Sequence, residues 1–112
     1  MTTQVNNISQ LRKGVLQGCL LMLLNSEPSY GYAITQRLST FGFAEIPKGT
    51  IYPLLMTMEK KGLLTSRMQD SPDGPKRKYY HLTATGEQAR QDFLQDWQAL
   101  TQNVARIIQS ED

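Results

Sequence analysis

The stretch "GTIYPLLMTMEKKGLL", residues 49–64, combines a helical repeat of apolar residues with a marked end. The apolar side chains at i, i+3, i+4 and i+7 are Ile51, Leu54, Leu55 and Met58. This spacing predicts an amphipathic helix of about three turns. Thr50 is the expected N-cap, and Pro53 would then lie in the first turn, where its missing N–H forfeits no intrahelical bond. Gly62 can adopt the left-handed conformation that ends a helix.

After Gly62 the helical spacing gives way to two short runs that favour β-strands. These runs are "LLTSRMQD" (63–70) and "KRKYYHLT" (76–83), and they are joined by "SPDGP" (71–75). A loop that holds Pro and Gly between two such runs predicts a β-hairpin. Alternation along the second strand turns Tyr80 and Leu82 toward the core. It sends three side chains to the open face, which are Arg77, Tyr79 and His81.

Two helices are predicted before this unit and one long helix after it. The first runs from Ile8 to Leu24 and is apolar almost all round, and a shorter one follows Ser29, its expected N-cap. The last runs from Thr83, another N-cap, to about Ser110. Helix, short helix, amphipathic helix and hairpin, in this order, form a winged helix-turn-helix. The expected fold is therefore mainly α (α+β), with a winged helix-turn-helix domain in residues 1–83, a two-stranded wing and a long C-terminal helix in 84–112.

Charge is unevenly distributed along the chain. The net charge of the 112 residues is only +2, but residues 1–47 carry +1, residues 48–78 carry +4 and residues 79–112 carry −3. The middle third is therefore the candidate surface for a polyanion, and the last third should avoid one. The alternative is that surface lysines fall in this order with no partner to face.

In a winged helix-turn-helix the third helix presents its exposed face to the major groove of DNA, and the hairpin lies along the adjacent backbone. The predicted contacts from the helix are Lys48, Thr50, Tyr52, Pro53 and Met56. The predicted contacts from the wing are Lys76, Arg77, Lys78 and Tyr79, because clustered cations on a turn release counterions from phosphates. Two alternatives stay open: the lysines only protect the edge of a solvated hairpin, or Tyr52 packs against the wing.

Three stretches together resemble the PadR family of bacterial winged-helix transcriptional repressors. They are "YGYAITQRL" (30–38), "GTIYPLLMTMEKKGLL" (49–64) and "KYYHLT" (78–83) followed by "TGE" (85–87). The resemblance extends from about Leu16 to the last helix, and the single C-terminal helix is similar to the shorter PadR subclass. It implies that residues 48–61 form the recognition helix, that the hairpin is the wing, and that the last helix pairs with the first helix of a partner subunit.

The last helix carries a heptad seam made of Phe93, Trp97, Leu100, Val104 and Ile107. A helical domain this small cannot bury the whole seam, so we expect a homodimer built on this helix. Two-fold symmetry would place two recognition helices about one DNA turn, roughly 34 Å, apart and require palindromic double-stranded operator DNA.

Trp97 lies in the middle of that seam and has two interpretations. It is a large interface anchor, or it faces its symmetry mate and walls a slot for a planar aromatic effector, cations included. The resemblance favours the slot, since short PadR-like repressors include drug-responsive members. Asp92 and Asp96 would then attract a cation, and the bound effector would release the protein from its operator.

Several classes of protein fit the sequence poorly. His81 is the only histidine and Cys19 the only cysteine, and there is no ligand-spaced metal set and no Gly-rich phosphate loop. We therefore expect no enzyme, no metal and no cofactor. The apolar run around Cys19 is too short to cross a bilayer, which predicts a soluble cytoplasmic protein. The remaining rival is a winged-helix module that binds protein and no DNA.

Overall fold

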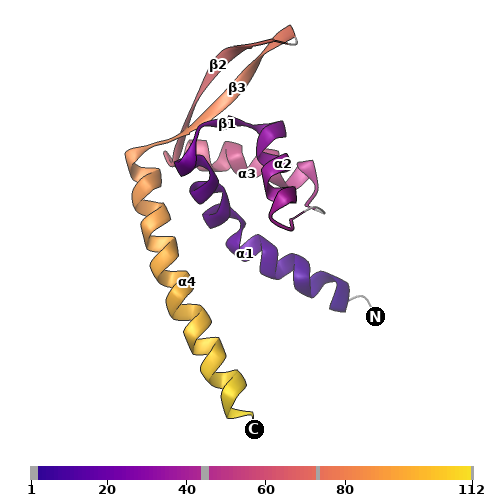
Figure 1. The fold of residues 1–112 in the computed structure, drawn as a ribbon, viewed down its shortest axis with the longest axis vertical. Helices are drawn as coiled ribbons and strands as arrows, with labels where there is room; N and C mark the ends of the chain where they lie inside the picture. The colour runs from indigo at the N-terminus through magenta and orange to yellow at the C-terminus, as the bar shows by residue number, and fades with distance from the viewer. Residues whose placement is uncertain (1–2, 44–45, 73, 112) are drawn as a thin grey trace.

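The structure is a computed structural model that describes residues 3–43, 46–72 and 74–111. Within these residues the chain forms four helices and three strands (Figure 1). In chain order they are α1 (Thr3–Ser26), β1 (Ser29–Tyr30), α2 (Gly31–Thr40), α3 (Lys48–Lys60), β2 (Leu64–Ser71), β3 (Gly74–Leu82) and α4 (Ala84–Ser110). This order confirms the predicted mainly helical winged helix-turn-helix with a long C-terminal helix.

The core lies where α1, α2 and α3 meet the base of the sheet. Its fully buried members are Leu16, Leu20, Leu21, Ile34, Ile51, Leu55 and Met58. Three of the four residues in the predicted apolar stripe of α3 are thus buried, and Leu54 packs against the core from its edge. α3 packs into the core by this face, and Lys48, Pro53 and Met56 on its other side are exposed.

The start of α3 differs from the sequence prediction, whereas its end agrees with it. The helix begins at Lys48 with Pro47 as its N-cap residue, and Thr50 lies inside the first turn. The prediction of Thr50 as N-cap was therefore wrong, and so was the placement of Pro53, which lies inside the helix. At the other end Gly62 has φ +81°, and Leu63 N–H donates to the Met58 carbonyl at 3.0 Å. This is the expected left-handed glycine end, in a Schellman arrangement.

The sheet holds one more strand than predicted. β2 and β3 form the antiparallel wing, with Leu64 opposite Leu82 and Arg67 opposite Tyr79. β1 joins the other edge of β3, where Ser29 pairs with Tyr80. Ser29 is thus a buried strand residue and not the N-cap of α2, a role that falls to Tyr30 without a side-chain hydrogen bond. Of the predicted turn, Asp73 lies outside the described residues.

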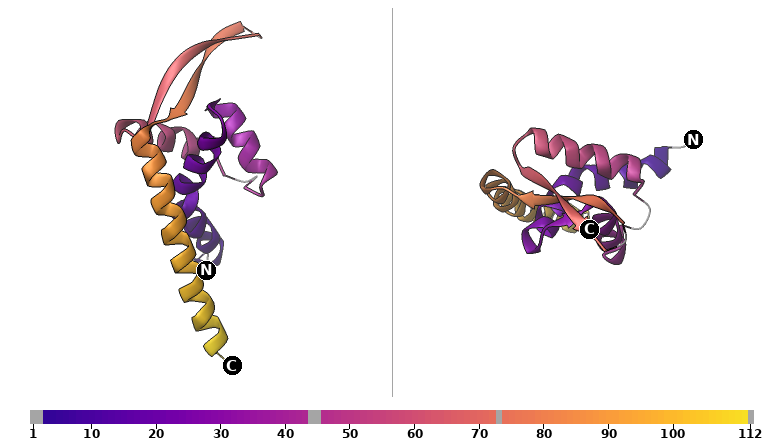
Figure 2. Two further views of the ribbon diagram at one scale, coloured as in Figure 1. Left: turned by 60° about the vertical axis from the view of Figure 1, so that its left-hand side comes forward. Right: turned by 90° about the horizontal axis from the view of Figure 1, so that it is seen from above.

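The first and last helices lie at the side of the molecule away from the wing. α1 begins at Thr3, earlier than the predicted Ile8, and α4 begins after Thr83, whose hydroxyl accepts a hydrogen bond from Gly86 N–H at 2.9 Å as predicted. α4 extends beyond the start of α1, and its C-terminal turns project at the opposite end from the wing tip (Figure 2). The molecule measures 58 × 35 × 23 Å.

Candidate nucleic-acid interface

The outer face of α3 carries the residues predicted to meet DNA. Lys48, Pro53 and Met56 are exposed, Tyr52 is 39% exposed, and Thr50 is half-buried. The Lys48 ammonium lies 5.6 Å from the centre of the Tyr32 ring, which extends this face onto α2. The accessible face of α3 therefore combines a cation near its N-terminus with an aromatic and a thioether side chain.

Tyr52 rests its ring against Gly31, the first residue of α2. A Cβ at position 31 would lie 2.7 Å from Tyr52 Cε1, so any larger residue would displace the ring. Sequence reasoning weighed packing of Tyr52 against the wing but did not single out Gly31. No sequence signal identifies it, because the requirement for glycine comes from a residue on another helix.

The outer face of the wing is anchored to β1 by a cation–π contact and a tilted pair of tyrosine rings. The Arg77 guanidinium lies 4.4 Å from the centre of the Tyr30 ring, and the Tyr30 and Tyr79 ring centres are 5.1 Å apart. Tyr80 faces the other way and is buried, as strand alternation predicted. Lys76, nearer the tip, is exposed. The structure thus ties Arg77 and Tyr79 to the body of the molecule and leaves Lys76 at the surface.

The inner face of the wing is joined to the end of α3 by an ion pair. Lys78 Nζ lies 3.2 Å from Glu59 Oε1, and Ser66 Oγ donates to Glu59 Oε2 at 2.6 Å. The hydrogen bond from Ser66, together with Lys78, lowers the pKa of Glu59. Glu59 likewise raises the pKa of Lys78. Sequence reasoning grouped Lys78 with the phosphate contacts and missed Glu59 as its partner, because the two residues are distant in the chain.

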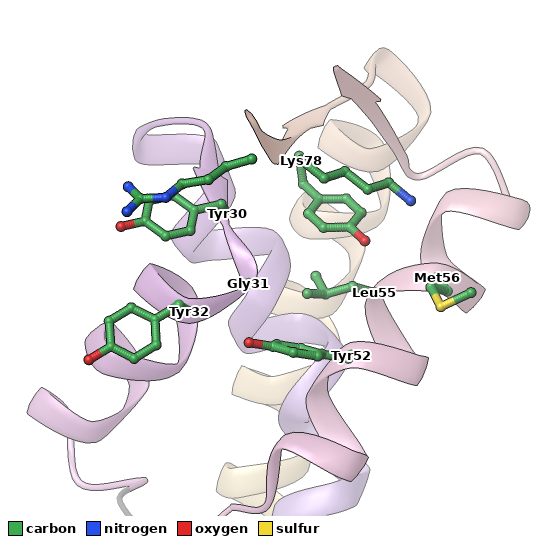
Figure 3. Close-up of a pocket in the computed structure, with 9 residues that line it drawn as sticks. Tyr30, Gly31, Tyr32, Tyr52, Leu55, Met56 and Lys78 are labelled. Atoms are coloured by element: carbon green, nitrogen blue, oxygen red, sulfur yellow. The ribbon is translucent and has the colours of Figure 1, made fainter. Parts of the chain in front are cut away.

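A groove lies where α2, α3 and the wing converge (Figure 3). We call it the tyrosine groove, since it is lined by four tyrosines and two apolar residues of α3, namely Tyr30, Tyr32, Tyr52, Tyr80, Leu55 and Met56. Arg77 and Lys78 border it on the wing side. Its volume is about 500 Å³.

The sequence matches the transcriptional regulator PadR-like family over residues 20–92, which span α2, α3, the wing and the start of α4. The chain belongs to this family.

Three known transcriptional regulators are similar to this chain. A solved Streptococcus transcriptional regulator is 46% identical, with a TM-score of 0.81 over 88% of this chain and 96% of that chain. A PadR family regulator from Eggerthella lenta is 31% identical, with a TM-score of 0.85 over 95% of this chain and 92% of that chain. Transcriptional regulator Rv3488 of Mycobacterium tuberculosis is 36% identical over 79 residues, 70% of this chain and 69% of that protein.

Membership in the PadR-like family makes this chain a transcriptional regulator and confirms that it is not an enzyme. Among the described residues, no group of three or more His, Cys, Asp or Glu side chains is placed to hold a metal ion. No helix in the described part of the chain has an apolar stretch long enough to cross a membrane. The Cys19 thiol is free and half-buried, and burial raises its pKa.

The predicted seam of this PadR-like chain is largely uncovered within one copy. Trp97 is 42% exposed and Leu100 is 55% exposed, and Val104 and Ile107 are exposed as well. Phe93 is half-buried, and its ring stacks on Trp97 with centres 6.2 Å apart and an interplanar angle of 17°. Phe93 also covers Gly18 of α1, where a Cβ would lie 2.5 Å from its ring carbons. The seam is therefore connected to the core at one end and open along the rest.

The two carboxylates predicted to attract a cation lie at the surface of α4. Asp92 and Asp96 are both exposed, and Gln88 Nε2 donates to Asp92 Oδ1 at 3.0 Å. One turn before them, Glu87 accepts two hydrogen bonds from Arg90. Arg90, with a further bond from Gln91, lowers the pKa of Glu87 to about 2.

Proposed function

We propose that this PadR-like regulator is a sequence-specific DNA-binding repressor that acts as a homodimer in the cytoplasm. The observation that carries the proposal is the exposed face of α3, which lies beside a wing whose Lys76 is exposed and whose Arg77 is half-buried against Tyr30. In this proposal Tyr52 and Met56 meet base edges or thymine methyls, and Lys48 with the wing cations meets phosphates. Bound across a promoter, such a protein would exclude the polymerase.

The dimer of this proposal uses residues 84–112 for association and residues 1–83 for DNA. Exposed seam residues such as Leu100 and Ile107 support it, because a single copy leaves them in water. The facing surface would be supplied by the first and last helices of the second copy. Two α3 helices related by a two-fold axis then require a palindromic operator.

The effector site of this proposal lies at the two-fold axis, between Trp97 and its symmetry mate. The stacked Phe93 and Trp97 rings support it, since they already form a flat aromatic wall. A planar aromatic cation would stack there and be attracted by Asp92 and Asp96. Its binding would lower operator affinity only as far as it favours a dimer with displaced α3 helices. The simpler role of Trp97, an interface anchor, predicts no such ligand.

The test is a binding titration with fragments of the protein's own promoter region at two salt concentrations. We expect an affinity that falls steeply with salt and prefers one palindrome over random duplex. A protein-binding module would show neither property. Transcription from the selected promoter should fall when the protein is added and recover with a planar cationic dye. An increase in transcription would contradict repression without contradicting DNA binding.

A further inference from the structure

The start of α2 is the place where the three parts of the candidate interface meet. β1 ends at Tyr30, which pairs with Tyr79 of the wing, and α2 begins at the next residue, Gly31. The ring of Tyr52 from α3 lies against that glycine, and Figure 3 shows it extending from α3 toward α2. Gly31 therefore connects the wing, through β1, to the outer face of α3.

The contact with Tyr52, and not the backbone, is what requires glycine at position 31. Gly31 does not have a positive φ, so its backbone conformation does not favour glycine. It lies in the first turn of a helix, and alanine has the higher helix propensity. An added Cβ would, however, lie 2.7 Å from Tyr52 Cε1, 3.1 Å from Cζ and 3.3 Å from Cδ1. One edge of the tyrosine ring thus occupies the space that any side chain at position 31 would take.

Displacement of the Tyr52 ring would change the surface of α3 more than the core. Tyr52 is 39% exposed, whereas Leu55, almost one turn further along α3, is fully buried. Tyr52 also lines the tyrosine groove, whose volume of about 500 Å³ gives a displaced ring room to move. A side chain at position 31 should therefore move an aromatic surface on α3 and leave the packing of Leu55 intact.

We propose that Gly31 is a positioning residue for base recognition, which acts by fixing the place of the Tyr52 ring on the outer face of α3. The inference rests on the proposed function, in which Tyr52 meets base edges or thymine methyls. Such a contact selects a base only when the side chain is held in one place. The wing cations meet phosphates without reading bases, so their contribution should be the same in a Gly31 variant.

The test compares the operator duplex, selected in the promoter titration, with a random duplex of equal length. Gly31→Ala should lower the affinity for the operator about tenfold, within the range of one lost base contact. It should change the affinity for random duplex by less than about twofold, because phosphate contacts dominate there. The free energy of unfolding, measured by chemical denaturation, should stay close to that of the wild type. A glycine needed only for folding would instead lower this free energy and weaken both duplexes alike.

A matched control makes the same substitution where no ring is in the way. Gly14→Ala places a Cβ on α1 that meets nothing within 4 Å, and it should change neither DNA affinity.

A double-mutant cycle shows whether Gly31 acts through Tyr52. Tyr52→Ala alone should lose at least as much operator preference as Gly31→Ala. Adding Gly31→Ala to Tyr52→Ala should then cause no further loss, since no ring remains to be displaced. A further loss of the same size in that background would overturn the proposal. A Gly31→Ala protein that keeps the wild-type operator preference would overturn it as well.

An NMR measurement without DNA separates this inference from the proposed function. The wild type and Gly14→Ala should give cross-peaks between the Tyr52 ring protons and the Hα protons at position 31, and Gly31→Ala should weaken them. Equal cross-peaks in Gly31→Ala would show that Gly31 does not place the ring. If the wild type prefers no duplex, the proposed DNA-binding function fails and the role of Gly31 in base recognition fails with it. The cross-peaks still decide in that case whether Gly31 places Tyr52.

Discussion

Between Leu16 and Leu64 the apolar side chains of three helices and the sheet meet in one core, whereas from Gln95 to Glu111 every residue is exposed. Five of those exposed residues are large and apolar, namely Trp97, Leu100, Val104, Ile107 and Ile108. The core of residues 1–83, which we call the winged-helix end, is thus complete within one copy of the chain. The distal half of α4 is a helix whose apolar face lacks a covering surface, and a second copy can supply it.

The two ends also differ in charge, and the difference predicts which of them meets a polyanion. The stretch that holds α3 and the wing carries +4, whereas residues 79–112 carry −3. A polyanion such as DNA should therefore be attracted to α3 and the wing and repelled by residues 79–112.

The largest expected effect comes from removing the seam, with Leu100→Asp. A buried carboxylate in the dimer interface should leave a monomer at micromolar concentration, measured by sedimentation. Operator affinity should fall on the order of a hundredfold or more, because each monomer then binds one half-site without linkage to the other. The melting temperature of the winged-helix end should change little.

Gln102→Asp is the matched control, since at 3.6 residues per turn Gln102 lies on the opposite side of α4 from Leu100. It adds the same charge and should leave the dimer intact. A wild-type protein that is already monomeric would contradict the claim that a second copy covers the apolar face of α4. A Leu100→Asp protein that stays dimeric would contradict it as well.

The next effect concerns the contact that joins the two ends, Gly18 with Phe93. Gly18→Ala places a Cβ 2.5 Å from the Phe93 ring, so the ring must move, together with Trp97 stacked on it. We expect a loss of about 1–3 kcal/mol in the free energy of unfolding, as for overpacked cores. Gly14→Ala, in the same helix, meets nothing within 4 Å and should stabilise by up to about 1 kcal/mol. Equal changes in the free energy of unfolding of the two variants, measured by chemical denaturation, would show that the contact between Gly18 and Phe93 does not stabilise the fold.

The sequence predicted those parts of the molecule that depend on local repetition. The stripe of Ile51, Leu55 and Met58 and the heptad from Phe93 to Ile107 each repeat within one helix, so spacing identified them. The alternation that buries Tyr80 is equally local.

The features that sequence reasoning missed depend on residues brought together by folding. β1 is two residues long, too short to show a strand period, and it exists because β3 offers an edge to Ser29. The N-cap of α3 is a local exception, because Pro47 occupies that position and Thr50 does not, although threonine has the better capping side chain. Glu59 and Lys78, like Gly31 and Tyr52, lie on different elements, and no periodicity relates them.

A smaller effect is expected from the wing, with Lys76→Ala combined with Arg77→Ala. All duplexes should bind more weakly by a similar factor, and sequence preference should survive, because phosphate contacts position the protein without reading bases. The slope of log affinity against log salt should flatten by about one for each of the two cations that meets a phosphate.

The control for the wing variant is Lys13→Ala combined with Arg106→Ala. It removes the same charge from exposed positions on α1 and α4, away from the wing. Its salt slope should stay close to that of the wild type. Unchanged affinity and slope in the wing variant would mean that the basic turn does not clamp the DNA backbone.

The smallest expected effect compares two carboxylates of lowered pKa, Glu59 at the winged-helix end and Glu87 on α4. Glu59→Gln should cost less than about 1 kcal/mol of stability, since its pair with Lys78 is partly exposed. It should also release Lys78 toward DNA, raising affinity for random duplex and steepening the salt slope by up to about one. Glu87→Gln should change neither DNA property, because its partner Arg90 lies one turn away on the same helix.

The pH dependence of unfolding separates the stabilising part of this effect from the DNA-binding part. Both folded-state pKa values lie below the ordinary 4.5, so each carboxylate stabilises the fold fully above about that pH and progressively less as pH falls through its folded value. For Glu87 that loss continues down to about pH 2. The melting temperatures of the wild type and Glu59→Gln should therefore differ at pH 7 and converge in acid. The salt slopes of DNA binding are compared at pH 7 alone. A difference in melting temperature that persists at low pH would show that Glu59 acts through packing, and its ion pair with Lys78 would not be what holds the wing to α3.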